Sequence, residues 1–138
     1  MEIRPFHAED EAAVIALWQR CKLTRPWNDP SKDVRRKLRV QRELFLVGIE
    51  DGALVAAVMA GYDGHRGSVN YLAVDPQRRR RGHGAALMRR VEQILAERGC
   101  PKVNLMVRSA NAEVIAFYRT LGYAPDEVVP LGKRLIPD

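Results

Sequence analysis

The chain has 138 residues, of which 46% are hydrophobic, and a formal net charge of +6. This length predicts a single domain over residues 1–138, and the apolar content excludes a largely disordered chain. Residues 1–4 lead into polar residues, and no stretch is long and apolar enough to cross a bilayer, so we expect no signal peptide and no membrane partner. Cys21 and Cys100 have neither a disulfide framework nor metal-ligand spacing, so we expect no metal and a cytoplasmic location.

The first half of the chain predicts one strand, two helices and then three antiparallel strands. We expect strands over residues 2–5, 44–50, 53–62 and 68–74, and helices over 8–21 and 32–42. Within the first helix, Val14, Leu17 and Trp18 share one apolar face. Asp51–Gly52 and residues 63–67 have the composition of hairpin turns.

The second half predicts a helix over residues 85–98, a strand over 102–108, a short helix over 111–121 and at least one strand over 128–136, interrupted by Pro130. Strands that flank a crossover helix run parallel to each other. The expected order is therefore β-α-α-β-β-β-α-β-α-β, an α/β fold with a mixed sheet and helices on both faces.

Four arginines, Arg78 to Arg81, run directly into Gly82 and Gly84 at the start of the third expected helix. The first turn of a helix has unpaired N–H groups, glycines let a ligand approach the backbone, and guanidinium groups bind phosphate oxygens. Without this run the net charge would fall from +6 to +2, so the basic excess is local and favours an anionic ligand over nucleic acid. The sequence predicts a polyanion site, most simply for pyrophosphate. Taken alone, the glycines also suit a turn, and the arginines a solvated face.

Two known phosphate-binding patterns do not fit this stretch. A Walker loop requires Gly-Lys-Ser/Thr, and a dinucleotide fingerprint requires a third glycine where Leu87 stands. Instead, Arg79-x-x-Gly82-x-Gly84 resembles the acyl-coenzyme-A motif of the GCN5-related N-acetyltransferase (GNAT) superfamily. The second motif of that superfamily is matched by Asn111, Phe117–Tyr118 and Leu121-Gly122-Tyr123. Residues 25–30, 61–67 and 131–135 further resemble the small bacterial YpeA-type acetyltransferases.

This resemblance implies the GNAT fold, with six to seven strands, and transfer of an acetyl group from acetyl-CoA to an amine. The resemblance implies that the pantetheine arm pairs with the strand that contains Tyr71, that backbone N–H groups from Arg79 to Gly84 hold the pyrophosphate, and that Asn111 contacts the arm. A helix N-cap is the alternative for Asn111. The implied coenzyme-binding residues are Leu72, Ala73, Val74, Arg79, Arg80, Arg81, Gly82, His83, Gly84, Ala85, Asn111, Phe117 and Tyr118.

The resemblance also implies a catalytic role for Tyr118, whose phenol would protonate or hold the leaving thiolate. A core aromatic position is the alternative. The general base is open, because neither of the two strands that flank the long helix carries a glutamate, and Met106 stands where a relative has one. Asp29, Asp63, His65 or an ordered water could take that role. Turn or surface positions are the alternatives for the three side chains.

The acceptor is expected near Trp27, Asn28 and Asp29, where an aromatic ring beside a carboxylate would receive a cationic amine. A small-molecule amine, a peptide N-terminus and a lysine side chain all fit. A coenzyme-binding sensor without catalysis is the alternative function, and nucleic-acid binding is not expected because no DNA-reading motif is present. A homodimer is one further expectation, because most soluble oligomers are symmetric pairs.

Overall fold

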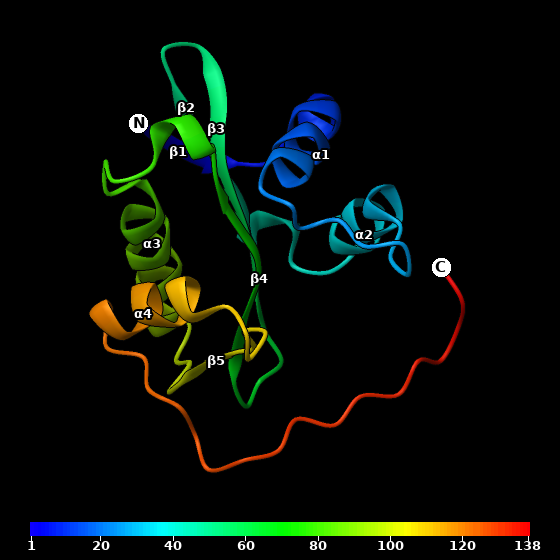
Figure 1. Ribbon diagram of the computed structural model, residues 1–138, viewed down its shortest axis with the longest axis vertical. Helices are drawn as coiled ribbons and strands as arrows, with labels where there is room; N and C mark the ends of the chain where they lie inside the picture. The colour runs from blue at the N-terminus through cyan, green and yellow to red at the C-terminus, as the bar shows by residue number, and fades with distance from the viewer. The chain divides into compact units, whose positions relative to one another are not determined.

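A computed structural model describes residues 1–138, and the chain divides into two compact units, residues 1–105 and 106–138 (Figure 1). The first unit contains β1 (Glu2–Pro5), η1 (Ala8–Asp10), α1 (Glu11–Arg20), α2 (Pro30–Lys37), η2 (Arg42–Leu44), β2 (Phe45–Glu50), β3 (Ala53–Tyr62), β4 (Gly67–Val74), η3 (Pro76–Arg78), α3 (His83–Glu97) and β5 (Val103–Leu105). The second unit contains α4 (Ala112–Thr120) and an extended tail.

The five strands of the first unit form one sheet in the order β1-β2-β3-β4-β5. Strands β1 to β4 pair antiparallel, whereas β5 runs parallel to β4 after the α3 crossover. The expected mixed sheet is confirmed, but the structure has five strands rather than six to seven.

The missing strand is the one predicted over residues 128–136, and that prediction was wrong. The tail contains no strand, and the Leu131 side chain is 92% exposed. Pro130 lacks the N–H that a strand ladder needs, and no other strand pairs with this segment, so apolar residues alone do not produce a strand here.

Helices cover both faces of the sheet in the first unit, with α1 and α2 on one face and α3 on the other (Figure 1). The predicted face of α1 is confirmed, because Val14, Leu17 and Trp18 are fully buried. The Trp18 ring stacks on Tyr71 with a centroid distance of 3.9 Å. On the opposite face, α3 buries Leu87, Met88, Val91 and Leu95, as its spacing predicts.

The second helix, α2, ends at Lys37, before the expected Arg42. After it the chain reverses at Gln41, whose φ is +50°. The Gln41 side-chain amide donates to Tyr62 O and accepts from Tyr62 N, each at 2.8 Å. These two hydrogen bonds fix the turn, and a side-chain partner of this kind cannot be predicted from helix propensity.

Strand β4 contains a bulge at its centre. Asn70 pairs with Met59 and Ala73 pairs with Ala57, so Tyr71 and Leu72 face a single residue of β3. Tyr71 has a φ of +53°, a left-handed conformation that is uncommon for a bulky residue. The bulge therefore holds the backbone of β4 in a strained conformation at one defined point.

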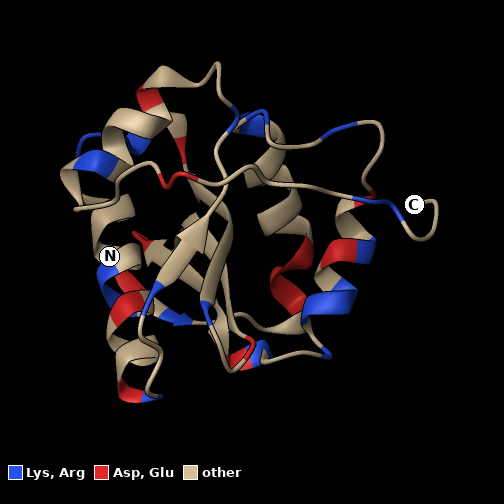
Figure 2. Ribbon diagram, turned by 90° about the horizontal axis from the view of Figure 1, so that it is seen from below, with Lys and Arg blue, Asp and Glu red and all other residues tan.

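Charged side chains lie mainly on the helices and connecting loops, and the strands are largely uncharged (Figure 2). Glu50, the last residue of β2, is the only charged residue in strands β2 to β5. None of the helices combines the length and apolar composition needed to span a bilayer.

Candidate functional site

The basic loop leads from β4 into α3 and leaves a series of backbone N–H groups without partners. Its start is fixed by Asp75, which accepts from Gln77 N at 3.0 Å. The first hydrogen bond at the start of α3 is Ala86 N to Gly82 O, at 3.0 Å. No N–H group from Arg79 to Ala85 donates a hydrogen bond within the protein. These donors stand at the positive end of a 15-residue helix, so the loop can bind an anion through its backbone.

Two residues of this loop adopt left-handed backbone conformations. Arg80 has a φ of +64° and Gly82 a φ of +79°. Gly82 is the residue immediately before α3, and a Cβ there would meet no atom within 4 Å. The glycine is therefore required for its backbone conformation and not for lack of space.

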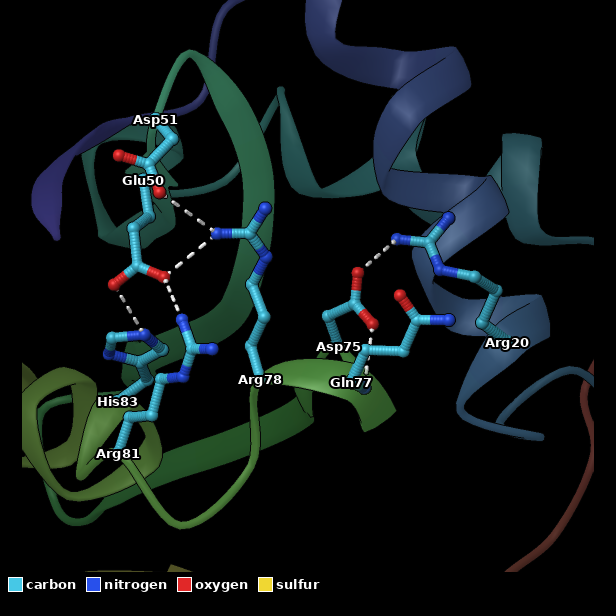
Figure 3. Close-up of polar contacts among 8 residues, drawn as sticks. All are labelled: Arg20, Glu50, Asp51, Asp75, Gln77, Arg78, Arg81 and His83. Atoms are coloured by element: carbon cyan, nitrogen blue, oxygen red, sulfur yellow. Dashed lines mark hydrogen bonds and ion pairs between the residues drawn. The ribbon is translucent and has the colours of Figure 1, made fainter.

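Glu50, at the end of β2, anchors the loop through its carboxylate (Figure 3). Its Oε1 accepts from Arg78 at 2.8 Å and from Arg81 at 2.9 Å. The hydrogen bond from Arg78, followed by the positive charges of His83 and Arg81, holds the pKa of Glu50 below its ordinary value. Glu50 is therefore ionised at neutral pH and ties the loop to the sheet.

The buried ring of His83 faces the other oxygen of the same carboxylate (Figure 3). Its Nε2 lies 2.9 Å from Glu50 Oε2, but the ring nitrogen does not meet hydrogen-bond geometry. The contact is therefore electrostatic when the imidazole is protonated. The His83 side chain faces the sheet, so only its backbone N–H remains for a ligand.

The four arginines of the run consequently fall into two pairs. Arg78 and Arg81 bind Glu50, whereas Arg79 makes one long contact, 3.4 Å from Nε to Val74 O, and Arg80 makes no hydrogen bond or ion pair. The first pair shapes the loop, and the second pair retains donors for phosphate oxygens.

Beside this loop, one edge of β4 is open. Its parallel pairing with β5 covers Gly67, Ser68 and Val69, and ends where Val69 meets Leu105. From Asn70 to Val74, β4 therefore has a strand neighbour only on the β3 side. An exposed strand edge is a place where an extended ligand can add through backbone hydrogen bonds.

In the second unit, Phe117, Tyr118 and Tyr123 form an aromatic cluster. The ring centroids lie 5.1 Å apart for Phe117–Tyr118 and 5.6 Å apart for Tyr118–Tyr123, both edge to face. Burial raises the pKa of Tyr118 to about 12. The phenol thus keeps its proton at neutral pH. Asn111 is the N-cap of α4, and its Oδ1 accepts from Val114 N at 3.3 Å.

The sequence matches the family model "Acetyltransferase (GNAT) family" over residues 12–123. The chain belongs to the GNAT family. It is 54% identical to acetyltransferase YE1169 of Yersinia enterocolitica over 138 residues, covering 100% of this chain and 98% of that protein. It is also 54% identical to acetyltransferase ECA0875 of Pectobacterium atrosepticum, with the same coverage. These relatives and the family model identify an acyltransferase that carries out acetyl transfer.

Solved structures show the same GNAT fold. Ard1 of Thermoplasma volcanium superposes with a TM-score of 0.78 at 29% identity, covering 89% of this chain and 82% of that one. The ribosomal-protein-S18-alanine N-acetyltransferase of Escherichia coli superposes with a TM-score of 0.72 at 25% identity, covering 88% and 76%. The NatB acetyltransferase complex, solved with CoA and MES, has a TM-score of 0.77 at 24% identity, covering 90% and 84%.

Several residues predicted near the acceptor of this GNAT protein have local structural roles. Asp29 is the N-cap of α2 and accepts from Ser31 N at 2.9 Å. Asp63 accepts from the backbone N–H groups of His65 and Arg66, each at 2.7 Å, and these bonds lower the pKa of the Asp63 carboxyl. Asp29 therefore lies in the turn that enters α2, and Asp63 lies in the hairpin turn between β3 and β4.

The remaining candidates are exposed or bound locally. Trp27 is 52% exposed. Asn28 donates its backbone N–H to Arg25 O at 3.1 Å. The His65 ring lies on the surface, with Nδ1 3.5 Å from the Arg66 guanidinium. Met106 follows the end of β5 and is 81% exposed.

Sequence reasoning missed two carboxylates of this GNAT protein. Glu50 reaches the loop from β2, and Asp33 of α2 accepts from the Tyr71 hydroxyl at 2.7 Å. A single negative charge at the end of an apolar strand was the available signal for Glu50. Nothing in the sequence pairs Asp33 with a residue 38 positions away. Within the chain, no group of three or more His, Cys, Asp and Glu residues could hold a metal ion.

Proposed function

We propose that this protein is an acetyl-CoA-dependent N-acetyltransferase that transfers the acetyl group directly to a primary amine. The observation that supports this most strongly is the set of unpartnered N–H groups from Arg79 to Ala85 beside the open edge of β4. The first feature suits a pyrophosphate and the second an extended amide-bearing arm. One ligand that carries both groups is coenzyme A.

The residues of the loop fit the charged part of that coenzyme. The backbone donors would hold the pyrophosphate, and Arg79 and Arg80 would reach further phosphate oxygens. The Glu50 contacts keep Arg78, Arg81 and the His83 ring in place before any ligand arrives. Preformed donors bind more tightly because little conformational entropy is lost on binding.

The open edge of β4, over Leu72, Ala73 and Val74, would pair with the amides of the pantetheine arm. Acetyl-CoA supplies an acetyl group activated as a thioester. A neutral amine attacks its carbonyl carbon within a ternary complex, so that a C–N bond forms and the C–S bond breaks. The backbone N–H near Leu72, displaced by the bulge, would donate to the oxyanion that develops.

Tyr118 would donate its phenolic proton to the departing thiolate, and the proton that the amine nitrogen loses as the C–N bond forms would pass to an ordered water and restore the phenol. A pKa of about 12 means that the donor is protonated throughout the physiological range. No covalent enzyme intermediate is part of this proposal. Asp63 is a poor candidate base, because the lowered pKa of its carboxyl makes it a weaker proton acceptor.

We further propose that both units act as one acyltransferase domain, since the family match extends through residues 12–123. The thiols of Cys21 and Cys100 are free, which suits a reducing cytoplasm. A homodimer remains part of the proposal, and sedimentation of the purified chain tests it directly.

Two measurements test the proposed function. Coenzyme A and acetyl-CoA should each raise the melting temperature through linkage, and the rise should grow with ligand concentration. A panel of primary amines, with thiol release as the readout, should then identify acceptors that turn over. Absence of any thermal shift at millimolar coenzyme would reject the proposal, and a shift without turnover would point to a coenzyme sensor.

A further inference from the structure

Asp33 and Tyr71 form a polar contact between α2 and the bulge of β4. The Tyr71 hydroxyl donates to Asp33 Oδ2 at 2.7 Å. The other oxygen, Oδ1, accepts from Arg36 at 3.2 Å. The Asp33 side chain is 22% exposed, so the carboxylate is in contact with solvent. Neither residue's side chain has a part in the proposed function described so far.

Tyr71 is held tightly where its backbone is strained. Its ring stacks on the fully buried Trp18, and its hydroxyl is bound to Asp33. A residue in a left-handed conformation persists only where its surroundings fix it, and such residues concentrate at functional sites. Asp33 is therefore one of the groups that fix the bulge.

The contact also places a negative charge close to the open edge of β4. One tyrosine side chain separates the Asp33 carboxylate from the backbone of the bulge, next to Leu72. If the thioester lies along this edge, as proposed above, the Asp33 carboxylate lies one tyrosine side chain away from the strand that holds it. This step rests on the proposed function.

The two interactions of the Asp33 carboxylate, with Tyr71 and with Arg36, differ in strength. The Tyr71 hydrogen bond is short and partly buried, whereas Arg36 is an exposed i,i+3 partner, and exposed ion pairs of this kind are weak. An incoming ammonium group can therefore replace the guanidinium at Oδ1 while Tyr71 keeps the carboxylate oriented.

The basic residues of α2 act in the opposite direction. Lys32, Arg35 and Arg36 are positively charged and would repel a cationic acceptor. At physiological ionic strength, however, exposed charges that make no contact with the acceptor are screened over about 8 Å, whereas an ammonium group held at the partly buried Asp33 carboxylate would be screened less. The short-range contact with Asp33 thus decides which charge the site prefers.

We propose that Asp33 is a substrate-binding residue that selects cationic acceptor amines, and that Tyr71 is the residue that positions it. The acceptor class is a small amine that carries a second, cationic group, and this second ammonium group contacts Asp33 Oδ1 while the reacting amine is neutral. Asp33 recognises the charge of the acceptor, and neither Asp33 nor Tyr71 transfers a proton.

The test uses two probes of equal chain length and opposite terminal charge, 1,4-diaminobutane and 4-aminobutanoate. Binding of each to the coenzyme-A-saturated full chain is measured by calorimetry at 0.15 M salt. The wild type should bind the diamine at least about tenfold more tightly. In Asp33→Asn the ratio of the dissociation constant of 4-aminobutanoate to that of the diamine should fall by about tenfold. The asparagine amide still accepts from Tyr71 but carries no charge.

Matched variants separate recognition from folding. Tyr71→Phe keeps the stack on Trp18 and should reduce the ratio by less than Asp33→Asn does. Glu97→Gln removes one charge from α3, on the opposite face of the sheet, and should leave the ratio unchanged (Figure 1). If Asp33 had a purely structural role, Asp33→Asn would weaken the binding of both probes equally.

The outcomes distinguish this inference from the proposed function. An unchanged ratio in Asp33→Asn, or no preference for the diamine in the wild type, would overturn the role of Asp33 alone. A wild-type chain that shows no thermal shift with coenzyme A would overturn the proposed function, and this inference with it.

Discussion

Arg78 donates to Glu50 across 2.8 Å and thereby joins the basic loop to the end of β2. The same carboxylate oxygen accepts from Arg81. Two of the four arginines in the basic run, Arg78 and Arg81, therefore stabilise the fold through Glu50. Because Glu50 is a carboxylate, protonation of Glu50 at low pH should weaken this attachment of the loop.

Glu50 should contribute to the stability of the fold in a pH-dependent way. Its pKa in the folded protein lies below the unfolded value of about 4.3, chiefly because of the Arg78 hydrogen bond. Its stabilisation is therefore present above that unfolded value and is lost as the pH falls through the folded pKa. Glu50→Gln should show a smaller decrease in melting temperature below about pH 4 than the wild type shows. Glu97→Gln is the matched control, and identical acid slopes for wild type and Glu50→Gln would contradict this role.

Gly82→Ala should weaken coenzyme binding and stability together. A left-handed conformation costs an alanine about 1–2 kcal/mol, and relaxation of that backbone would turn the N–H donors away from the ligand. Gly52→Ala is a matched control, since Gly52 has a φ of +75° and similarly open space around its Cβ. Both variants should lose similar stability in urea titrations, and only Gly82→Ala should lose the coenzyme-induced thermal shift. Equal coenzyme affinity in the two would contradict the loop assignment.

Arg80→Ala should reduce coenzyme affinity by about threefold to tenfold with little change in stability. Arg80 makes no ion pair in the structure, so its removal leaves the loop anchored by Glu50. Calorimetry at two salt concentrations should show a smaller salt dependence in this variant, because one phosphate contact is lost. Arg66→Ala, in the β3–β4 turn, provides the control. Arg78→Ala should instead lower the melting temperature of the ligand-free protein.

Tyr118→Phe should lower kcat by about a hundredfold while leaving the dissociation constant of coenzyme A nearly unchanged. The wild-type rate should show no alkaline decline from this group below pH 11, because the pKa of Tyr118 is raised to about 12. Tyr123→Phe changes a neighbouring ring of the same cluster and should retain activity. Unchanged turnover in Tyr118→Phe would remove its role as a proton donor.

Local patterns predicted the parts of the fold that depend on periodic burial. The apolar face of α3, including Leu87 and Val91, follows from helical spacing alone. The strand predicted over residues 128–136 was wrong because Pro130 interrupts its backbone donors and no other strand pairs with it. Hydrophobicity indicates that a segment can be buried, but pairing decides whether it becomes a strand.

The site was predictable only where its function depends on consecutive residues. The basic loop could be identified because its arginines, its glycines and the helix start adjoin one another in sequence. Glu50 and Asp33 act across 28 and 38 positions of the chain, and their contacts depend on the register of the sheet and the placement of α2. Contacts between residues so far apart in the chain cannot be predicted from local sequence patterns.

The Gln41 side chain supplies both a donor and an acceptor to Tyr62, where β3 extends beyond its pairing with β2. The Gln41 carboxamide makes the two hydrogen bonds to Tyr62 that the backbone of a neighbouring strand would otherwise make. This stretch of main chain is thereby closed to pairing with other molecules, whereas the stretch of β4 after Val69 remains available. One exposed edge of the sheet is thus protected from self-association, whereas another edge of the same sheet has no strand partner.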